Sequence, residues 1–174
     1  LIISQSKHRF YLIEDIYIDG VTSFRYTSNE SCSAYGISIS SQGRDSSNAI
    51  CRNIIVKNIC AIGGYHTEAQ GVFHYNSQSL KFKFYNIIIE NIIARGYPIS
   101  QAIGFSPNSR YRTSAYNISV SNVFAFYSGD ASNTNAYGIA CIGTYTEYPV
   151  YLYNSSVANI VAVGGGNSYN FQNT

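Results

Sequence analysis

The fold is decided by a stretch that recurs along the chain and is clearest in Ile87-Ile-Ile-Glu-Asn91-Ile-Ile-Ala-Arg-Gly96. Apolar and polar residues alternate within it, which is the pattern of a β-strand with one buried face. Four other segments align with it: Tyr11–Gly20, Ile54–Gly63, Ile118–Tyr127 and Ser155–Gly164. The alignment places a polar residue at one fixed position in every copy: Asp15, Asn58, Asn91, Asn122 and Asn159.

Two further motifs complete the repeat. An Ala-x-Gly-apolar motif falls between the copies, at Ala34–Ile37, Ala69–Val72, Ala102–Phe105 and Ala136–Ile139, with its glycines 35, 33 and 34 residues apart. A looser β-like run closes each period, at 49–52, 81–85, 111–116 and 150–153. A second asparagine column precedes four of the copies: Asn53, Asn86, Asn117 and Asn154. Three short strands per period, repeated four to five times, predict an all-β solenoid in a single domain, residues 1–174.

The fixed asparagine column identifies the kind of solenoid. Equivalent amides in successive coils lie about 4.8 Å apart and can hydrogen-bond to one another. Such a ladder resembles the right-handed parallel β-helices of the pectate-lyase-like superfamily. The resemblance implies that Asn58, Asn91, Asn122 and Asn159, with Asp15 as an imperfect member, form a buried structural ladder at a bend. It implies little about chemistry, because the superfamily includes lyases, hydrolases, phage tailspikes and surface adhesins. A β-sandwich or a propeller is the alternative, although sandwich strands do not repeat column by column.

The composition agrees with a β-protein and excludes some functions. There are 23 Ile and 9 Val but only 4 Leu, and β-branched residues favour strands. Charged residues make up 11% of the chain and the net charge is +2, so phosphate neutralisation of a nucleic acid is not expected. No apolar run reaches the ~18 residues of a membrane-spanning helix, so membrane insertion is not expected either.

The candidate catalytic groups have simpler structural interpretations. Glu14, Lys57 and Glu90 are expected in one outward column, either as a charge ladder or as part of a groove. His66 and Glu68 are expected in a loop, where an acid–base pair is the alternative to a solvated turn. The clustered aspartates of pectin-cleaving relatives are absent, since Asp45 follows Arg44 and Asp130 stands alone.

Cysteine and histidine spacings predict neither a metal site nor a cofactor. The cysteines, Cys32, Cys51, Cys60 and Cys141, are expected as free thiols in or near the core, although three disulfide pairings are formally open. Sequons at Asn29, Asn117 and Asn154 leave glycosylation open, because two of them arise from the repeating asparagine column.

Tyrosine is in surplus, with 17 residues and no Trp. Tyr65, Tyr97 and Tyr127 follow or occupy the same turn column in three successive coils and could line one stripe of surface. Tyrosine rings stack on sugars and also suit strands. These three residues, with Asp130, are the candidate carbohydrate-binding set. The variable loops 20–33, 40–48 and 127–135 are expected to border any binding groove.

The function expected from these observations is a non-catalytic recognition or structural segment that contacts surface glycans. Its expected setting is an extracellular, cell-surface or virion fibre, as in a tailspike or an adhesin. A polysaccharide lyase or glycoside hydrolase of the same superfamily is one alternative, and a self-stacking structural filament is another. Because the terminal coils lack an evident cap, the chain is expected to be part of a longer polypeptide or to pair with other copies through its ends.

Overall fold

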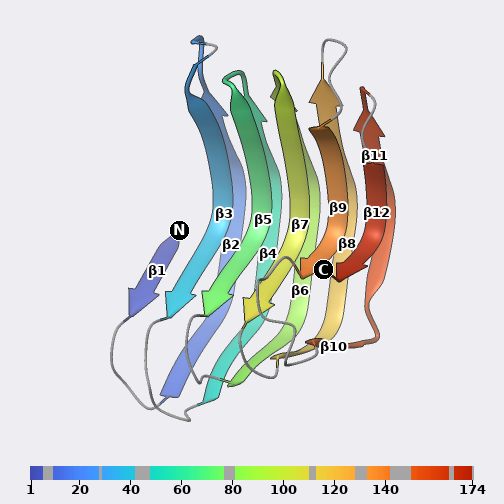
Figure 1. Ribbon diagram of the computed structural model, residues 1–174. Coiled ribbons are helices and arrows are strands. Elements are labelled where there is room, and N and C mark those ends of the chain that lie inside the picture. Colours follow the sequence, from blue (N-terminus) through green and yellow to red (C-terminus); the bar gives the residue numbers. More distant parts are fainter. Residues whose placement is uncertain are drawn as a thin grey trace.

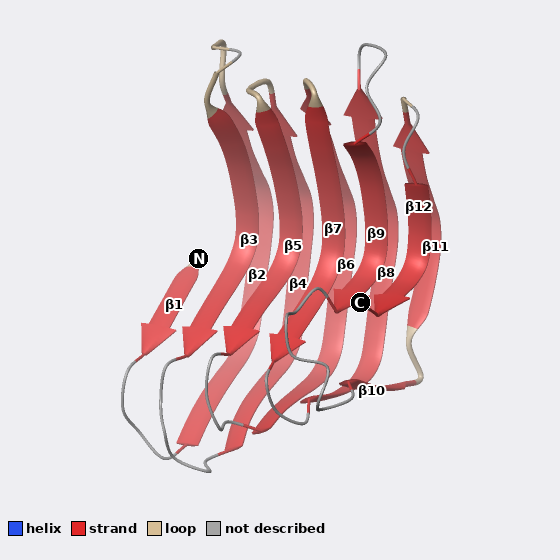
Figure 2. Ribbon diagram, viewed as in Figure 1, coloured by secondary structure: helices blue, strands red, loops and turns tan. Residues whose placement is uncertain are grey.

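A computed structural model describes residues 1–5, 10–27, 29–41, 48–76, 81–109, 113–127, 133–141, 150–164 and 167–173. Its regular elements are strands joined by loops (Figure 2). The strands are β1 (Ile2–Gln5), β2 (Phe10–Phe24), β3 (Ser31–Ser41), β4 (Asn48–Ile62), β5 (His66–Asn76), β6 (Lys81–Gly96), β7 (Ile99–Ser109), β8 (Thr113–Tyr127), β9 (Asn133–Cys141), β10 (Val150–Tyr153), β11 (Ser156–Val163) and β12 (Asn167–Asn173).

The strands form two parallel sheets that face each other. Sheet A has the order β1-β3-β5-β7-β9-β12, and sheet B has the order β10-β8-β6-β4-β2, with β11 continuing beside β8. Each coil rises through sheet B on the far side of Figure 1 and descends through sheet A on the near side, which is a right-handed winding as the chain advances. The expected parallel β-solenoid is therefore confirmed, and the two termini lie at opposite ends of the stack.

From β2 to β9 each coil has two long strands instead of the three short ones expected, whereas the last coil keeps β10 and β11 as separate short strands before β12. Strand β4 joins the run 49–52 and the copy beginning at Ile54 into one element of 15 residues. Its buried side chains come in pairs, residues 49 and 51, 54 and 56, and 59 and 61. Two successive residues face outward between pairs, so the strand bends there without losing its neighbours in the sheet.

The bends are made by residues in the left-handed region. The non-glycine residues with positive φ among those described are all Asn or Asp, the side chains that tolerate this region best. They are Asp15, Asn53, Asn58, Asn86, Asn91, Asn117, Asn122, Asn154 and Asn159, with φ between 48° and 60°. Within a coil the two bends lie five residues apart, as Asn53 and Asn58 do.

The expected asparagine ladder is present. Asn91 Nδ2 donates to Asn58 Oδ1 at 2.9 Å, and Asn122 and Asn159 each donate to the preceding asparagine at 3.0 Å. Asn58 itself donates to Asp19 at 2.6 Å.

A second ladder runs along the other bend. Its amide-to-oxygen distances are 2.9, 3.1 and 3.0 Å through Asp15, Asn53, Asn86 and Asn117. Asp15 thus belongs to this second ladder, and the alignment of the first coil with the others was wrong by five residues. Bends that recur every five residues make two alignments of that coil nearly equivalent, and the sheet register decides between them because Ile16 pairs with Ile54.

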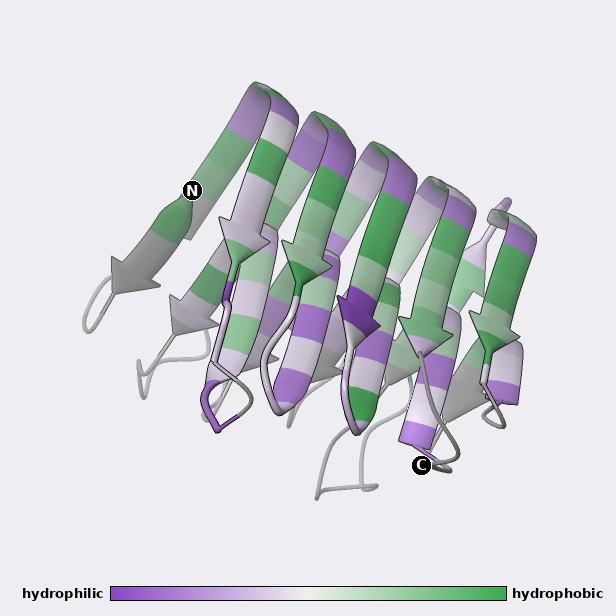
Figure 3. Ribbon diagram, turned by 90° about the horizontal axis from the view of Figure 1, so that it is seen from above, coloured by the Kyte–Doolittle hydropathy of each residue, from purple (hydrophilic) through white to green (hydrophobic). Residues whose placement is uncertain are grey.

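The ladder side chains are not buried, which corrects a second expectation. Asn91 and Asn122 are half-buried, whereas Asn58 and Asn159 are exposed. The amides satisfy one another on the outside of the bends, where water also reaches them. The core lies between the sheets and consists mainly of Ile, Val, Ala and Phe, including Phe82, Phe84 and Phe105. Bands of similar hydropathy line up from strand to strand, as stacked equivalent residues require (Figure 3).

Candidate functional site

A concave site lies where the chain passes from sheet B to sheet A. We call this border the turn edge and define it by residues 25–27, 63–65 and 96–98. Backbone hydrogen bonds tie its coils together, from Arg25 N to Ile62 O at 3.0 Å and from Gly63 N to Arg95 O at 2.8 Å. Tyr97 N donates to Gly64 O at 3.3 Å, so the second and third coils are joined at the same level.

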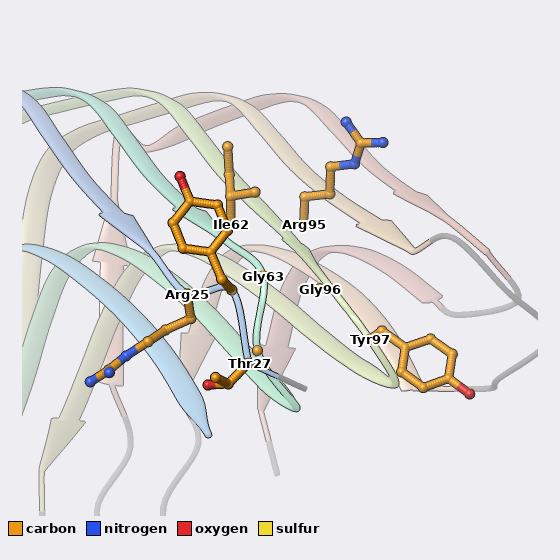
Figure 4. Close-up of a pocket in the computed structure, with 9 residues that line it drawn as sticks. Arg25, Thr27, Ile62, Gly63, Arg95, Gly96 and Tyr97 are labelled. Carbon is orange, nitrogen blue, oxygen red and sulfur yellow. The ribbon is translucent and has the colours of Figure 1, made fainter. Parts of the chain in front are cut away.

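Glycine makes the space for a pocket at the turn edge. Gly63 and Gly64 have φ of 87° and 89°, a conformation that side chains disfavour. A Cβ at Gly63 would collide with the carbonyl oxygen of Arg25, and one at Gly96 would collide with Thr67. The floor is therefore backbone. The pocket has a volume of about 260 Å³ and is lined by Arg25, Tyr26, Thr27, Ile62, Gly63, Gly64, Arg95, Gly96 and Tyr97 (Figure 4).

Two arginines give the pocket its charge. Arg25 forms an exposed ion pair with Glu30 at 2.8 Å. Arg95 has no ion-pair partner among the residues that the structure describes. The two guanidinium groups extend away from each other on opposite sides of the turn, and their stems border the pocket (Figure 4). Planar guanidinium donors suit carboxylate, sulfate or phosphate oxygens and the hydroxyls of sugars.

The tyrosines predicted for carbohydrate binding are partly brought together. The rings of Tyr97 and Tyr127 stack with centroids 5.4 Å apart and planes at 17°. Tyr97 is 56% exposed and lines the pocket, whereas Tyr127 is 9% exposed and supports it from behind. Tyr65 is exposed on the neighbouring coil. Asp130 lies outside the described residues.

Sequence reasoning missed Tyr26, Arg25 and Arg95 as members of this site. The expected loop 20–33 is shorter than predicted, because β2 continues to Phe24 and β3 begins at Ser31. Its residues 25–27 do border the pocket, as expected of a variable loop. Residues 42–47 and 128–132, in the other two predicted loops, lie outside the described part of the chain. The sequence signal that could have pointed to the site is the Gly63-Gly64 pair in the turn after the second copy of the repeat.

Every carboxylate in the described part of the chain has a partner. Lys57 pairs with Glu90 at 2.8 Å, which confirms that part of the expected charge ladder. Glu14 is not in that column: it pairs with Arg52, and Asp19 takes its place beside Lys57. This correction follows from the five-residue shift of the first coil.

Asp19 has partners on two sides. Asn58 and the Tyr17 hydroxyl both donate hydrogen bonds to its carboxylate, and these bonds lower the pKa of Asp19. The Asp19 carboxylate accepts the hydrogen bond of Asn58 at the end of the first ladder, so the simplest role of Asp19 is structural.

His66 and Glu68 lie on strand β5, and the loop expected for them is wrong. Glu68 faces outward on sheet A and accepts a hydrogen bond from the Tyr35 hydroxyl at 2.6 Å and another from Gln70. Burial, and then the bond to Glu68, raises the pKa of Tyr35 to about 12. Glu68 is therefore held by Tyr35 and Gln70, and His66 is not among its partners in the described part of the chain.

The described cysteines are free. Cys32 and Cys51 are buried and Cys60 is half-buried, which confirms three of the four expected free thiols. Burial raises the pKa of Cys51 to about 12, so this thiol is unreactive. The side chain of Cys141 lies outside the described set. No group of three potential metal ligands occurs in the described ranges, and these ranges contain no helix long and apolar enough to cross a membrane.

Asn117, one of the three sequon residues, donates its amide to the second ladder at 3.0 Å. A glycan on that nitrogen would compete with the ladder bond. The structure therefore assigns this side chain a role in the stack.

Comparison with known proteins adds no family to this description. No protein-family model matches the chain, and neither a curated protein nor a solved structure matches it.

Proposed function

We propose that the protein is a non-catalytic recognition segment that binds surface glycans through its turn edge. Its setting is an extracellular assembly, either a virion fibre of the tailspike kind or a cell-surface adhesin. Among the families of similar architecture, the pectate-lyase-like β-helices are the ones that the asparagine ladder resembles. The observation that carries the proposal is the glycine-floored pocket between exposed tyrosines and arginines.

The pocket has the chemistry that sugars require. Tyr26 and Tyr97 are exposed and offer apolar ring surface together with hydroxyl groups. Arg95 adds guanidinium donors that no described acidic side chain occupies. The backbone floor is held by hydrogen bonds between coils, so little ordering is needed when a ligand binds.

The partners of the carboxylates support recognition over catalysis. Polysaccharide hydrolases use two carboxyl groups on either side of the scissile bond. The described carboxylates instead bond to Arg, Lys, Asn, Gln or Tyr within the sheets and turns. A structural role accounts for each of them.

The test is glycan-array binding followed by titration of the best ligand. Arg95→Ala and Tyr97→Ala should each weaken binding about tenfold or more, because each removes a direct contact. Tyr151→Ala is the matched control, since Tyr151 is also an exposed tyrosine but lies on β10, away from the turn edge. Binding that survives both turn-edge substitutions contradicts the proposed site.

The same experiment separates recognition from catalysis. The bound glycan is incubated with protein and its chain length is followed over days. An unchanged length is expected. New reducing ends or unsaturated sugar products would favour the lyase or hydrolase alternative.

A further inference from the structure

Three tyrosines form a column on the outer face of sheet B. Tyr85, Tyr116 and Tyr153 occupy equivalent positions on strands β6, β8 and β10. The ring centroids of Tyr85 and Tyr116 lie 4.9 Å apart with planes at 9°, and those of Tyr116 and Tyr153 lie 4.7 Å apart with planes at 8°. The three phenol rings are therefore stacked almost parallel, one per coil. We call this column the tyrosine stack.

The backbone fixes the register of the tyrosine stack. Each of its tyrosines directly precedes an asparagine with positive φ at a bend, Asn86, Asn117 or Asn154. Asn117 donates to Asn86 at 3.0 Å, beside the first pair of rings. Strand pairing and the ladder bond thus keep the rings opposite one another, at the separation of adjacent strands.

Solvent access distinguishes the tyrosine stack from the other stacked tyrosine pairs in the described part of the chain. Tyr153 is 45% exposed, and Tyr85 and Tyr116 are half-buried. Each of the other two pairs contains one ring that is nearly covered, Tyr127 at 9% exposure or Tyr137 at 7%. Among these pairs, adjacent phenols that are both open to solutes occur in the tyrosine stack.

We propose that Tyr116 and Tyr153 are a site of oxidative coupling, where a dityrosine bond joins β8 to β10. The oxidant is hydrogen peroxide used by a peroxidase. Each phenol loses one electron to the peroxidase and its hydroxyl proton to water, which leaves a phenoxyl radical with spin on the ortho carbons. One ortho carbon of each ring forms the new C–C bond, and the hydrogen on each of these carbons is replaced by one on the phenol oxygen. The two electrons and two protons reduce one hydrogen peroxide to two water molecules.

The geometry favours coupling within one chain. Radicals on separate molecules must meet by diffusion, whereas the stack holds two phenols 4.7 Å apart. Tyr153 lies on β10, a strand of four residues at the border of sheet B, so its ring has room to turn and bring the ortho carbons together. Tyr85 lies on β6, an inner strand of 16 residues, where its ring has less freedom. The bond is therefore expected between Tyr116 and Tyr153.

Such a bond would fasten the border of sheet B. Strand β10 is short and pairs with β8 on one side, and short border strands are the parts of a sheet that open most easily. The bond would also close a covalent loop that contains β9, which removes conformational freedom from the unfolded chain. The cross-linked protein should therefore unfold at a higher temperature than the untreated protein.

The experiment treats a dilute solution of the 174-residue chain with a haem peroxidase and hydrogen peroxide. Dityrosine fluorescence should appear in the monomer fraction, and the intact mass should fall by two hydrogens. Peptide mass spectrometry should find Tyr116 joined to Tyr153. Tyr153→Phe should lower the yield of this monomeric product about tenfold or more, because phenylalanine preserves the stack but forms no phenoxyl radical.

Tyr151→Phe is the matched control. Tyr151 is also an exposed tyrosine of β10, but its partner on β8 is Ser114. This variant should give the yield of the wild type, and circular dichroism should show that both variants fold. Equal yields from the two variants would overturn the proposal, and so would a product that joins two chains or maps to another pair of tyrosines. A cross-linked protein that melts no higher than the untreated one would contradict the fastening of β10.

Discussion

Asparagine performs two tasks at each bend of sheet B. Its backbone adopts a positive φ that few other residues accept, and its side chain bonds to the next coil. Glycine can replace the first task only, and it does so at Gly20, which occupies the position of Asn58 in the first coil. Most other residues perform neither task. Comparing a glycine with such a residue at the same bend therefore separates the contribution of the backbone from that of the side chain.

Asn91 provides that separation. Asn91→Gly keeps the bend but removes two ladder bonds, those to Asn58 and from Asn122. We expect a loss of about 1–2 kcal/mol in the free energy of unfolding. Asn91→Leu should cost about 1 kcal/mol more, because leucine disfavours the left-handed region. Denaturant unfolding measures both, and equal losses would contradict the strain contribution.

His74 is an unusual residue in the core. It is fully buried, neither ring nitrogen has a hydrogen-bond partner among the residues that the structure describes, and its ring centroid lies 3.8 Å from that of Phe82. Burial lowers the pKa of His74 to about 3. The side chain is therefore neutral in the folded protein wherever it would be charged in the unfolded chain.

This difference predicts acid sensitivity. Between the unfolded pKa of about 6.5 and the folded pKa of about 3, the unfolded chain binds more protons, so stability falls as pH falls through this range. The loss is at most about 5 kcal/mol. His74→Leu should flatten the pH dependence of the melting temperature above pH ~5, where the carboxylates remain ionised. His66→Gln, on the same strand but partly exposed, should not.

At the scale of the strand, the alternation of buried residues was predictable but the length of the element was not. Each asparagine in a strand resembles a turn signal, so the sequence predicts separate strands at 49–52 and 54–63 where the structure has one. The sheet continues through the bends because pairing resumes on both sides of each one. Asp15 was assigned to the wrong ladder for the same reason. The two bends of a coil lie five residues apart within one strand, so no element boundary in the sequence distinguishes the first bend from the second.

The candidate site was predictable only in part. Tyr97 and Tyr127 follow from the turn column, and the structure stacks them. The pocket depends on the close approach of the Arg25 backbone to Gly63. These two residues belong to adjacent coils, whose equivalent positions are 38 residues apart in the sequence. Because spacing within one coil says nothing about such a crossing, Arg25 and Arg95 could not be selected from the sequence.

The glycine column of sheet A, by contrast, was visible in the sequence and has a steric cause. A Cβ on Gly71 would collide with Ile89 and lie 2.6 Å from the Gly104 carbonyl oxygen. Gly71→Ala should therefore cost about 2–3 kcal/mol through overpacking. Gly20→Asn is the control, since a Cβ at Gly20 meets nothing within 4 Å and asparagine accepts its φ of 80°. Thermal unfolding should show a large drop for the first variant and little change for the second.

The whole molecule behaves as a stack in which each coil contacts its neighbours. Removing one complete period should leave a shorter stack that folds. Residues 64–96 form such a period, because Asn58 and Asn91 lie 33 residues apart in adjacent rungs. The deletion joins Gly63 to Tyr97 and keeps every inward column in place. We expect a cooperative unfolding transition and a β-type circular dichroism spectrum at reduced stability.

A deletion one residue shorter is the control. It shifts the following coils by one position in the strand and turns buried side chains outward. This variant should aggregate or remain unfolded. If both deletions fold equally well, the coils are not specified by register.

The ladders also give the stack a chemical direction. The ladder amides from Asn53 to Asn122, and that of Asn159, donate toward the coil before them and leave their oxygens for the coil after them. An ionised carboxylate accepts hydrogen bonds and donates none, so Asp15 and Asp19 suit a rung that accepts from the next coil without donating to another. Head-to-tail contact of identical copies would set these carboxylates against the amide oxygens of Asn154 and Asn159. Such a junction has acceptors on both sides and no proton between them, so a ladder continues past either of these rungs only where the next rung supplies a donor.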